Sequence, residues 1–284
     1  MSVVIRILVE GVAVGDDLKP SSFPIMGWDY ADDEPTPRSI PECGINCVAF
    51  VPETALDICQ RLSLEAIVHD PAITPARWDQ PFRSADSIAA LTALVKRVNG
   101  HPAVMGYHLK DEPGPDQFAE LGKAVAEVRK LAPGKWPYIN LTPGMGEGYD
   151  GFLDDFVKQC HPTILCEDNY PLGQDGRYSY VYWANLAQVR IAALRHRLPF
   201  WTNTLSVARM TYAEPTPASL RLQVLGALVY GDRGICYSKF ISRELPILEA
   251  PILATGEAAR STRSSRRLRP GISCGRCLRC LSRS

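Results

Sequence analysis

Eight short apolar segments alternate with longer segments of helical period along this chain of 284 residues. This alternation predicts an α/β fold in which parallel strands are joined by right-handed helical crossovers. Eight such units in roughly 220 residues match a (β/α)8 TIM barrel, which typically has ~250 residues. A doubly wound open sheet usually carries a glycine-rich phosphate turn after its first strand, whereas this chain has Gly27-Trp28-Asp29 there. The sequence therefore favours the barrel.

The predicted strands are short and rich in β-branched or aromatic residues, which is typical of parallel strands buried on both faces. They are Phe23–Trp28, Asn46–Val51, Glu65–Val68, Val104–Leu109, Tyr138–Leu141, Thr163–Cys166, Phe200–Thr204 and Gly234–Tyr237.

The predicted helices between these strands each have one apolar face. Ser84–Asn99 is followed by Gly100 as a stop signal, and Pro115–Leu131 starts with a proline suited to a first turn. The others are Glu53–Leu62, Tyr149–Cys160, Tyr180–Arg197, Thr216–Tyr230 and a weak last helix over Glu244–Ala259.

A single domain is expected, with an N-terminal extension over residues 1–20 and the barrel over 21–259. Residues 260–284 contain eight arginines, no acidic residue and almost no apolar periodicity, so an irregular, disordered basic tail is predicted. Without this tail, residues 1–259 carry a net charge of −8, which does not attract phosphate backbones. We therefore expect no nucleic-acid partner. The chain also contains no run of eighteen apolar residues, so no membrane span is predicted. The oligomeric state stays open.

Nine cysteines divide into two groups. The tail has Cys274, Cys277 and Cys280 at a spacing that matches part of an iron–sulfur motif, but without a fourth ligand or a nearby histidine. We therefore expect no metal and no cofactor. The others lie in apolar segments and are predicted to be free buried thiols; they are Cys43, Cys47, Cys59, Cys160, Cys166 and Cys236.

The active site of such a barrel lies at the carboxyl ends of its strands. Aromatic, amide, acidic and imidazole side chains are concentrated at these ends, and this mixture is suited to a sugar. The predicted substrate-binding residues are Trp28, Asp29, His69, Asp111, Asn140, Tyr170, Trp201, Asn203 and Tyr237.

The fourth strand ends in Lys110-Asp111-Glu112-Pro113, where the proline directs the chain out of the strand. Cleavage of a glycosidic bond needs one carboxylic acid to protonate the leaving oxygen and a second carboxylate across the sugar ring. Glu112 is the predicted acid/base. The alternative is that Asp111 and Glu112 only stabilise the start of the helix near Pro115.

Several of these segments together resemble the (β/α)8 glycoside hydrolases of the broad retaining clan that contains β-galactosidases and cellulases. They are Tyr107–Pro113, Tyr138–Leu141, Glu167–Pro171, Pro199–Trp201 and Gly234–Tyr237, and the likeness extends in order from Phe23 to Phe240. The resemblance implies a hydrolase of O-glycosidic bonds in oligo- or polysaccharides. It also favours a secreted or periplasmic location, although the N-terminal stretch is a poor signal peptide.

In that clan the acid/base is a Glu before Pro, usually preceded by Asn; Glu112 matches, whereas Asp111 departs from the pattern. The clan's nucleophile is a Glu at the end of strand seven, where this chain has Trp201-Thr202-Asn203-Thr204 and no carboxylate. The resemblance therefore does not carry over the standard double-displacement mechanism.

A second carboxylate must then come from another strand end. Glu167 and Asp168 end strand six, and the sequence does not decide which of the two side chains points inward. The resemblance favours Asp168, because it places an acidic residue before a polar residue, Tyr and Pro at this turn. Asp29 and Glu244 are weaker candidates. The alternative for Glu167 and Asp168 is a solvated loop or a helix cap.

Two other functions fit the same residues. A metal-dependent sugar isomerase or epimerase would use nitrogen and oxygen ligands at the strand ends; the candidates are His69, Asp70, His108, Glu112, Glu167 and Asp168. This interpretation ranks second because no His-x-His or His-Glu-x-x-His spacing is present. The third is a non-catalytic carbohydrate-binding barrel, in which the missing strand-seven Glu reflects lost chemistry.

Overall fold

The computed structural model describes residues 23–28, 40–41, 44–74, 81–82, 84–208 and 211–238. The N-terminal extension, Asp29, Cys43, the predicted helix over Glu244–Ala259 and the basic tail with its three cysteines lie outside these described residues.

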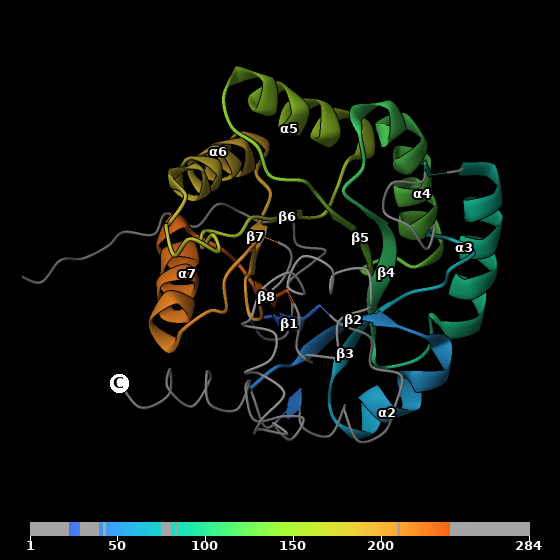
Figure 1. Ribbon diagram of the computed structural model, residues 1–284. Coiled ribbons are helices and arrows are strands. Elements are labelled where there is room, and N and C mark those ends of the chain that lie inside the picture. The colour runs from blue at the N-terminus through green and yellow to red at the C-terminus, as the bar shows by residue number, and fades with distance from the viewer. Residues whose placement is uncertain are drawn as a thin grey trace, which may run out of the picture.

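Eight parallel strands form a nearly closed barrel, as the alternation of segments predicts (Figure 1). Their order is β5-β4-β3-β2-β1-β8-β7-β6, and a parallel bridge between Leu141 and Glu167 links the two ends of the sheet. The strands are β1 (Ile25–Gly27), β2 (Cys47–Val51), β3 (Glu65–Val68), β4 (Val104–Asp111), β5 (Trp136–Asn140), β6 (Leu165–Asp168), β7 (Phe200–Thr204) and β8 (Ile235–Tyr237). The barrel prediction is confirmed.

Helices follow the strands and lie around the outside of the sheet (Figure 1). They are α2 (Leu56–Arg61, after a 3-10 turn over Glu53–Ala55), α3 (Ser84–Val98), α4 (Phe118–Leu131, after a 3-10 turn over Pro115–Gln117), α5 (Glu147–Cys160), α6 (Tyr180–His196) and α7 (Pro217–Tyr230). A capping box between Thr216 and Ser219 starts α7, and Gly231 ends it in the left-handed conformation that glycine adopts without strain. None of the described helices is long and apolar enough to cross a membrane.

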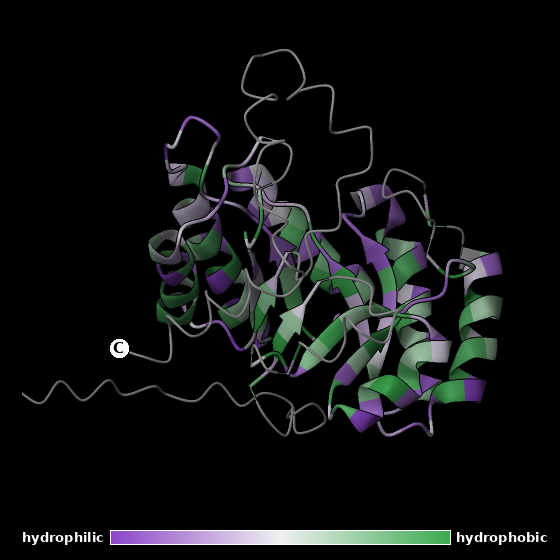
Figure 2. Cartoon of the chain, turned by 60° about the horizontal axis from the view of Figure 1, so that its bottom comes forward, coloured by the Kyte–Doolittle hydropathy of each residue, from purple (hydrophilic) through white to green (hydrophobic). Residues whose placement is uncertain are grey.

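Apolar side chains form two main cores, one on each face of the sheet, and the strands are accordingly mostly green in Figure 2. The outer core lies between the strands and the helices, and includes Val68, Leu109, Leu165, Phe200 and Ile235 with apolar residues of α3 to α7. The lumen core lies inside the barrel and includes Met26, Cys47, Ile67, Met105, Tyr138, Cys166, Trp201 and Cys236. Successive side chains of a regular strand alternate between the two faces of the sheet. The core to which an apolar residue belongs therefore shows which face the next, polar residue of the same strand points to.

Five of the predicted buried thiols are confirmed as free cysteines in the described residues. They are Cys47, Cys59, Cys160, Cys166 and Cys236. Burial raises the pKa of each of these thiols, so they remain protonated and behave as small apolar side chains.

Close contact between β4 and β5 depends on Gly106. A Cβ atom at this position would lie 2.3 Å from the carbonyl oxygen of Trp136 on the neighbouring strand. We expect Gly106→Ala to lower the free energy of unfolding by about 2 kcal/mol or more, because the strands would have to move apart. The measurement is urea denaturation.

The matched control for this substitution is Gly151→Ala in α5, where no atom lies within 4 Å of the added Cβ. Alanine has the higher helix propensity, so this variant should be as stable as the wild type or slightly more stable. Equal unfolding midpoints for the two variants would contradict the proposed clash.

Candidate functional site at the carboxyl end of the barrel

The two acidic residues that end β6 point to opposite faces of the sheet. Leu165 belongs to the outer core and Cys166 to the lumen core. Alternation along the strand therefore directs Glu167 outward, between sheet and helices, and Asp168 into the lumen. Of the two candidate carboxylates at the end of β6, only Asp168 faces the lumen, which opens at the mouth of the barrel.

Glu112 lies one residue beyond β4 and meets Asp168. Its φ of 45° lies in the left-handed region, which is strained for a residue other than glycine, while its N–H donates a 2.9 Å hydrogen bond to the carbonyl oxygen of Asn140. The carboxyl groups of Glu112 and Asp168 lie close enough to interact, because Glu112 contributes to the raised pKa of Asp168.

The environment of Asp168 favours its protonated form. Burial raises the pKa of this carboxyl well above its usual range, and the neighbouring carboxyl groups of Glu112, Asp111 and Glu167 raise it further. Asp168 therefore keeps its proton to higher pH than an ordinary aspartic acid does, and it lies beside a second carboxyl group, that of Glu112.

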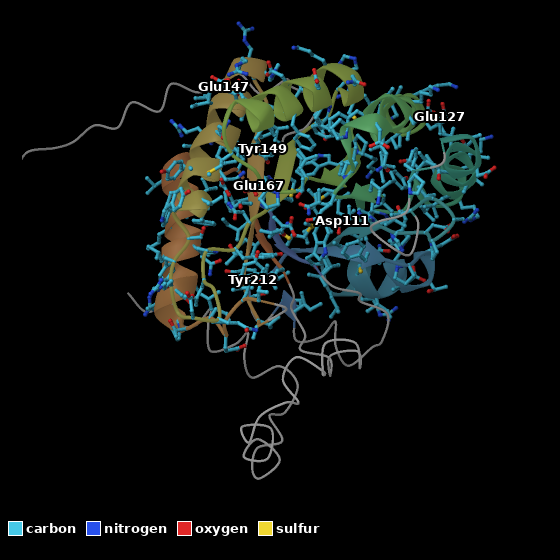
Figure 3. All side chains as sticks on the ribbon, turned by 45° about the horizontal axis from the view of Figure 1, so that its top comes forward. Asp111, Glu127, Glu147, Tyr149, Glu167 and Tyr212 are labelled. Carbon is cyan, nitrogen blue, oxygen red and sulfur yellow. The ribbon has the colours of Figure 1, made fainter. Side chains whose placement is uncertain are left out.

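Asp111 and two asparagines form a polar layer that extends across the lumen from β4 to β7. The Nδ2 atom of Asn140 donates to Oδ1 of Asp111 at 3.0 Å, and Nδ2 of Asn203 donates to Oδ1 of Asn140 at 3.0 Å. Figure 3 shows Asp111 near the middle of the barrel, while Glu127 and Glu147 lie at its periphery. The structure thus brings Asp111, Asn140 and Asn203 together, as expected for strand-end residues.

The two histidines at the ends of β3 and β4 form a pair. Their Nδ1 atoms lie 3.4 Å apart, and the ring of His108 contacts Phe50 at a centroid distance of 4.7 Å. Burial lowers the pKa of both imidazoles, and the charges of His69 and Lys110 lower that of His108 further. Both rings are therefore neutral at neutral pH. His69 is half-buried, whereas His108 is buried.

The predicted sugar-binding aromatic residues divide into two groups. Trp28 is half-buried and packs on Phe50, while Tyr170 follows β6 directly, with its hydroxyl 3.5 Å from Oδ2 of Asp168. By contrast, Trp201 is 1% exposed and packs against Trp136, one inward-facing layer below Asn203. Tyr237 belongs to the outer core. The structure therefore does not bring Trp201 and Tyr237 to the mouth, because packing and strand parity direct them elsewhere.

Glu167 belongs to a separate polar cluster behind the sheet. Thr202 Oγ1 donates to Oε1 of Glu167 at 2.8 Å, and the N–H of Thr202 donates to Oδ2 of Asp232 at 3.0 Å. Tyr149 and Tyr182 face the same cluster, since Glu167 contributes to the raised pKa of each. Figure 3 labels Glu167 and Tyr149 on this side of the barrel. Burial raises the pKa of Glu167 to about 8 and that of Asp232 well above its usual range.

Across the part of the chain that the structure describes, no three or more His, Cys, Asp or Glu side chains are grouped so that they could hold a metal ion. The candidate ligands of the isomerase interpretation are instead divided between the two faces, with Glu167 behind the sheet and Asp168 in the lumen.

The loop after β6 contributes functional candidates that the analysis of strand ends did not identify. It forms a small hairpin through a bridge between Leu172 and Tyr178, and a second bridge joins Gly173 to Tyr212 in the segment after β7. The Asp175-Gly176 pair, in which Gly176 has a φ of 75°, is the turn signal that could have revealed it. The hairpin places Tyr178 and Tyr212 beside a pocket at the barrel's rim.

Comparisons with protein-family models and with curated proteins find no match to this chain. Solved structures of similar fold do exist. A β-galactosidase from the psychrophilic Marinomonas ef1 matches with a TM-score of 0.63 and 12% identity over 90% of this chain. A β-glucuronidase from Ruminococcus gnavus matches with a TM-score of 0.56 and 10% identity over 78%. A Bacteroides thetaiotaomicron protein assigned as an α-L-fucosidase matches with a TM-score of 0.56 and 12% identity over 93% of this chain.

These structures have the TIM-barrel fold of glycoside hydrolases, and the present chain shares that fold at about 10% identity. The chain spans 59% of the β-galactosidase and 44% of the β-glucuronidase, but 98% of the α-L-fucosidase. At this level of identity the likeness establishes the architecture alone.

The buried Glu167 should make stability depend on pH. Its native pKa of about 8 lies above the value in an unfolded chain, about 4.3. The native state therefore keeps a proton that the unfolded chain has lost, and the free energy of unfolding falls as pH rises through this window. Glu167→Gln cannot ionise, so we expect it to exceed the wild type in stability at pH 8 by a few kcal/mol, on the order set by 1.36 kcal/mol per pKa unit.

The measurement is urea denaturation of both proteins at pH 5 and pH 8, with Glu147→Gln on the exposed start of α5 as the control. The gain should shrink strongly at pH 5, where Glu167 is protonated in the native state. A gain of equal size at both pH values would show that ionisation of Glu167 is not its cause.

Proposed function

We propose that this protein is a glycoside hydrolase that cleaves O-glycosidic bonds of oligo- or polysaccharides. The observation that carries the proposal is the pair of neighbouring carboxyl groups, Glu112 and Asp168, at the carboxyl ends of β4 and β6, in which burial and the charge of Glu112 raise the pKa of Asp168. Glycoside hydrolysis needs one protonated and one ionised carboxyl group, and we assign the proton to Asp168. The fold shared with a β-galactosidase and a β-glucuronidase supports the same assignment.

The proposed roles follow from where the proton lies. Asp168, with its raised pKa, protonates the leaving glycosidic oxygen as its bond to the anomeric carbon breaks, and the carboxylate of Glu112 supports the positive charge that develops on that carbon. Water supplies the hydroxyl group that ends on the anomeric carbon, and its proton restores the acid form of the pair. This reverses the role that the sequence suggested for Glu112, because burial favours the proton on Asp168. Asp111, which is partly exposed, binds a sugar hydroxyl beside the pair, while the buried Asn140 and Asn203 position it through their chain of hydrogen bonds.

The separation of the two carboxyl groups with a sugar bound between them decides the stereochemical outcome. In retaining glycosidases such groups lie about 5–5.5 Å apart, and in inverting ones about 6.5–9.5 Å apart.

One specific observation favours a second candidate, a carbohydrate-binding barrel without catalysis. The end of β7 carries Asn203 and Thr204 rather than a carboxylate. Such a protein would bind an oligosaccharide across the mouth and release it unchanged. Turnover of a broad panel of glycosides distinguishes the two candidates.

Removal of either carboxyl group should abolish hydrolysis. We expect Glu112→Gln and Asp168→Asn each to lower kcat/KM for an aryl glycoside by about 10²–10⁴-fold, the usual contribution of a positioned acid or base. The measurement is nitrophenol release across a panel of 4-nitrophenyl glycosides, with circular dichroism to verify that each variant is folded.

The control for this experiment is Glu147→Gln, which removes an exposed carboxylate at the start of α5 and should retain wild-type rates. Activity near that of the wild type in folded Glu112→Gln would rule out the catalytic assignment. Binding without turnover in the wild type would select the non-catalytic candidate.

The pH dependence of kcat/KM should reflect the protonated state of Asp168. Its raised pKa keeps the acid form present at pH values where an ordinary aspartic acid, with a pKa of about 3.9, has ionised. Activity should therefore persist to pH values well above that and decline only as pH rises through the raised pKa. An alkaline limb near pH 4 in the wild-type profile would contradict Asp168 as the proton donor.

A further inference from the structure

A pocket of about 460 Å³ opens at the rim of the barrel, next to the carboxyl pair but not lined by it. Three loops form it: Pro143 and Gly144 after β5, the hairpin after β6, and Thr211 and Tyr212 after β7. Its volume lies within the range of about 300–1,000 Å³ that is typical of small-molecule sites. The mechanism proposed above does not use this pocket.

Backbone hydrogen bonds hold the pocket open before any ligand binds. The N–H of Gln174 donates to the carbonyl oxygen of Thr211 at 2.9 Å. The N–H of Ala213 donates to the carbonyl oxygen of Leu172 at 3.2 Å. The N–H of Ser179 closes the hairpin on Pro171 at 2.8 Å. The loops after β6 and β7 are thus joined into one wall, and a ligand need not pay for ordering them.

Tyrosine rings dominate the chemistry of this wall. Tyr170 and Tyr212 pack edge to face with ring centroids 5.1 Å apart, and Tyr178 adds a third ring that is 45% exposed. Among the lining residues that the structure describes, only Asp175 and Arg177 are charged; Nε of Arg177 lies 3.8 Å from Oδ2 of Asp175, so their charges offset one another. Aromatic faces with hydroxyl, amide and carbonyl groups suit an uncharged ring with apolar faces and polar edges, which describes a neutral pyranose.

The pocket is directly connected to the carboxyl pair. Tyr170 lines the pocket, and its hydroxyl lies 3.5 Å from Oδ2 of Asp168. Asn169, which lines the pocket as well, follows Asp168 in the chain and donates to Oδ1 of Asn185 at 3.0 Å, which fixes its position. Tyr170 therefore contacts both the pocket and the proposed proton donor.

We infer that this pocket binds a second, neutral pyranose unit, the sugar joined through the scissile bond to the unit in the lumen. The inference rests on the proposed function and makes it more specific: the preferred substrate has at least two sugar units, and the hairpin after β6 recognises one of them. Tyr178 and Tyr212 contribute its aromatic platform.

The test measures binding and hydrolysis separately. Glu112→Gln is titrated calorimetrically with galactose, glucose and mannose and with the β-1,4-linked disaccharide of each, and wild-type protein is assayed on the corresponding 4-nitrophenyl glycosides. We expect at least one disaccharide to bind about tenfold more tightly than its monosaccharide. Addition of Tyr178→Ala should remove that gain, since an aromatic platform contributes on the order of a tenfold change.

Two matched variants isolate the ring of Tyr178. Tyr178→Phe preserves the aromatic face and should retain the tighter binding of the disaccharide. Tyr180→Ala removes a neighbouring tyrosine that is 73% exposed and does not line the pocket, so it should leave both affinities unchanged.

The outcomes separate this inference from the proposed function. Hydrolysis of an aryl glycoside, with disaccharides bound no more tightly than monosaccharides or without any effect of Tyr178→Ala, overturns the pocket and leaves the hydrolase intact. Tyr178-dependent disaccharide binding without any hydrolysis supports the pocket and overturns the hydrolase. No binding and no hydrolysis across the panel overturns both.

Discussion

Alternation of side chains along closed parallel strands is the constraint on which the structure of this site depends. Where a strand is regular, as β6 is, its residues point to the lumen core and to the outer core in turn, so two neighbouring residues cannot both reach the mouth. For β6 this places Asp168 beside Glu112 and sends Glu167 to Thr202 and Asp232. One chain thus has two acidic clusters, separated by the sheet.

Burial gives these clusters their chemistry. A carboxyl group removed from water favours its neutral form, and a second carboxyl nearby strengthens that preference. In the lumen this favours the protonated form of Asp168, beside the half-buried Glu112. Behind the sheet, burial likewise raises the pKa of Glu167, and ionisation of this buried carboxyl group lowers the stability of the protein as the pH rises. Position relative to the sheet separates a candidate catalytic acid from a structural one.

Rigidity at the rim complements the pair in the lumen. The strained conformation of Glu112 is held by the hydrogen bond of its N–H to Asn140, and the hairpin after β6 is held by its bonds to the segment around Thr211. Preformed loops on a packed barrel are the arrangement in which ligand sites are found in this fold.

The sequence by itself determined the architecture, because the alternation of buried strands and amphipathic helices is a local property of the chain. Its strand ends were less accurate: β4 continues through Lys110 and Asp111, and β6 through Glu167 and Asp168, since backbone pairing does not stop where apolar residues do. The same local pattern identified Glu112 and Asp168 as candidates. Only the tertiary structure decided that Asp168 faces the lumen, that Trp201 and Tyr237 do not reach the mouth, and that a tyrosine-lined pocket lies beside it. These depend on strand parity, packing and contacts between loops distant in sequence, which a linear pattern does not contain.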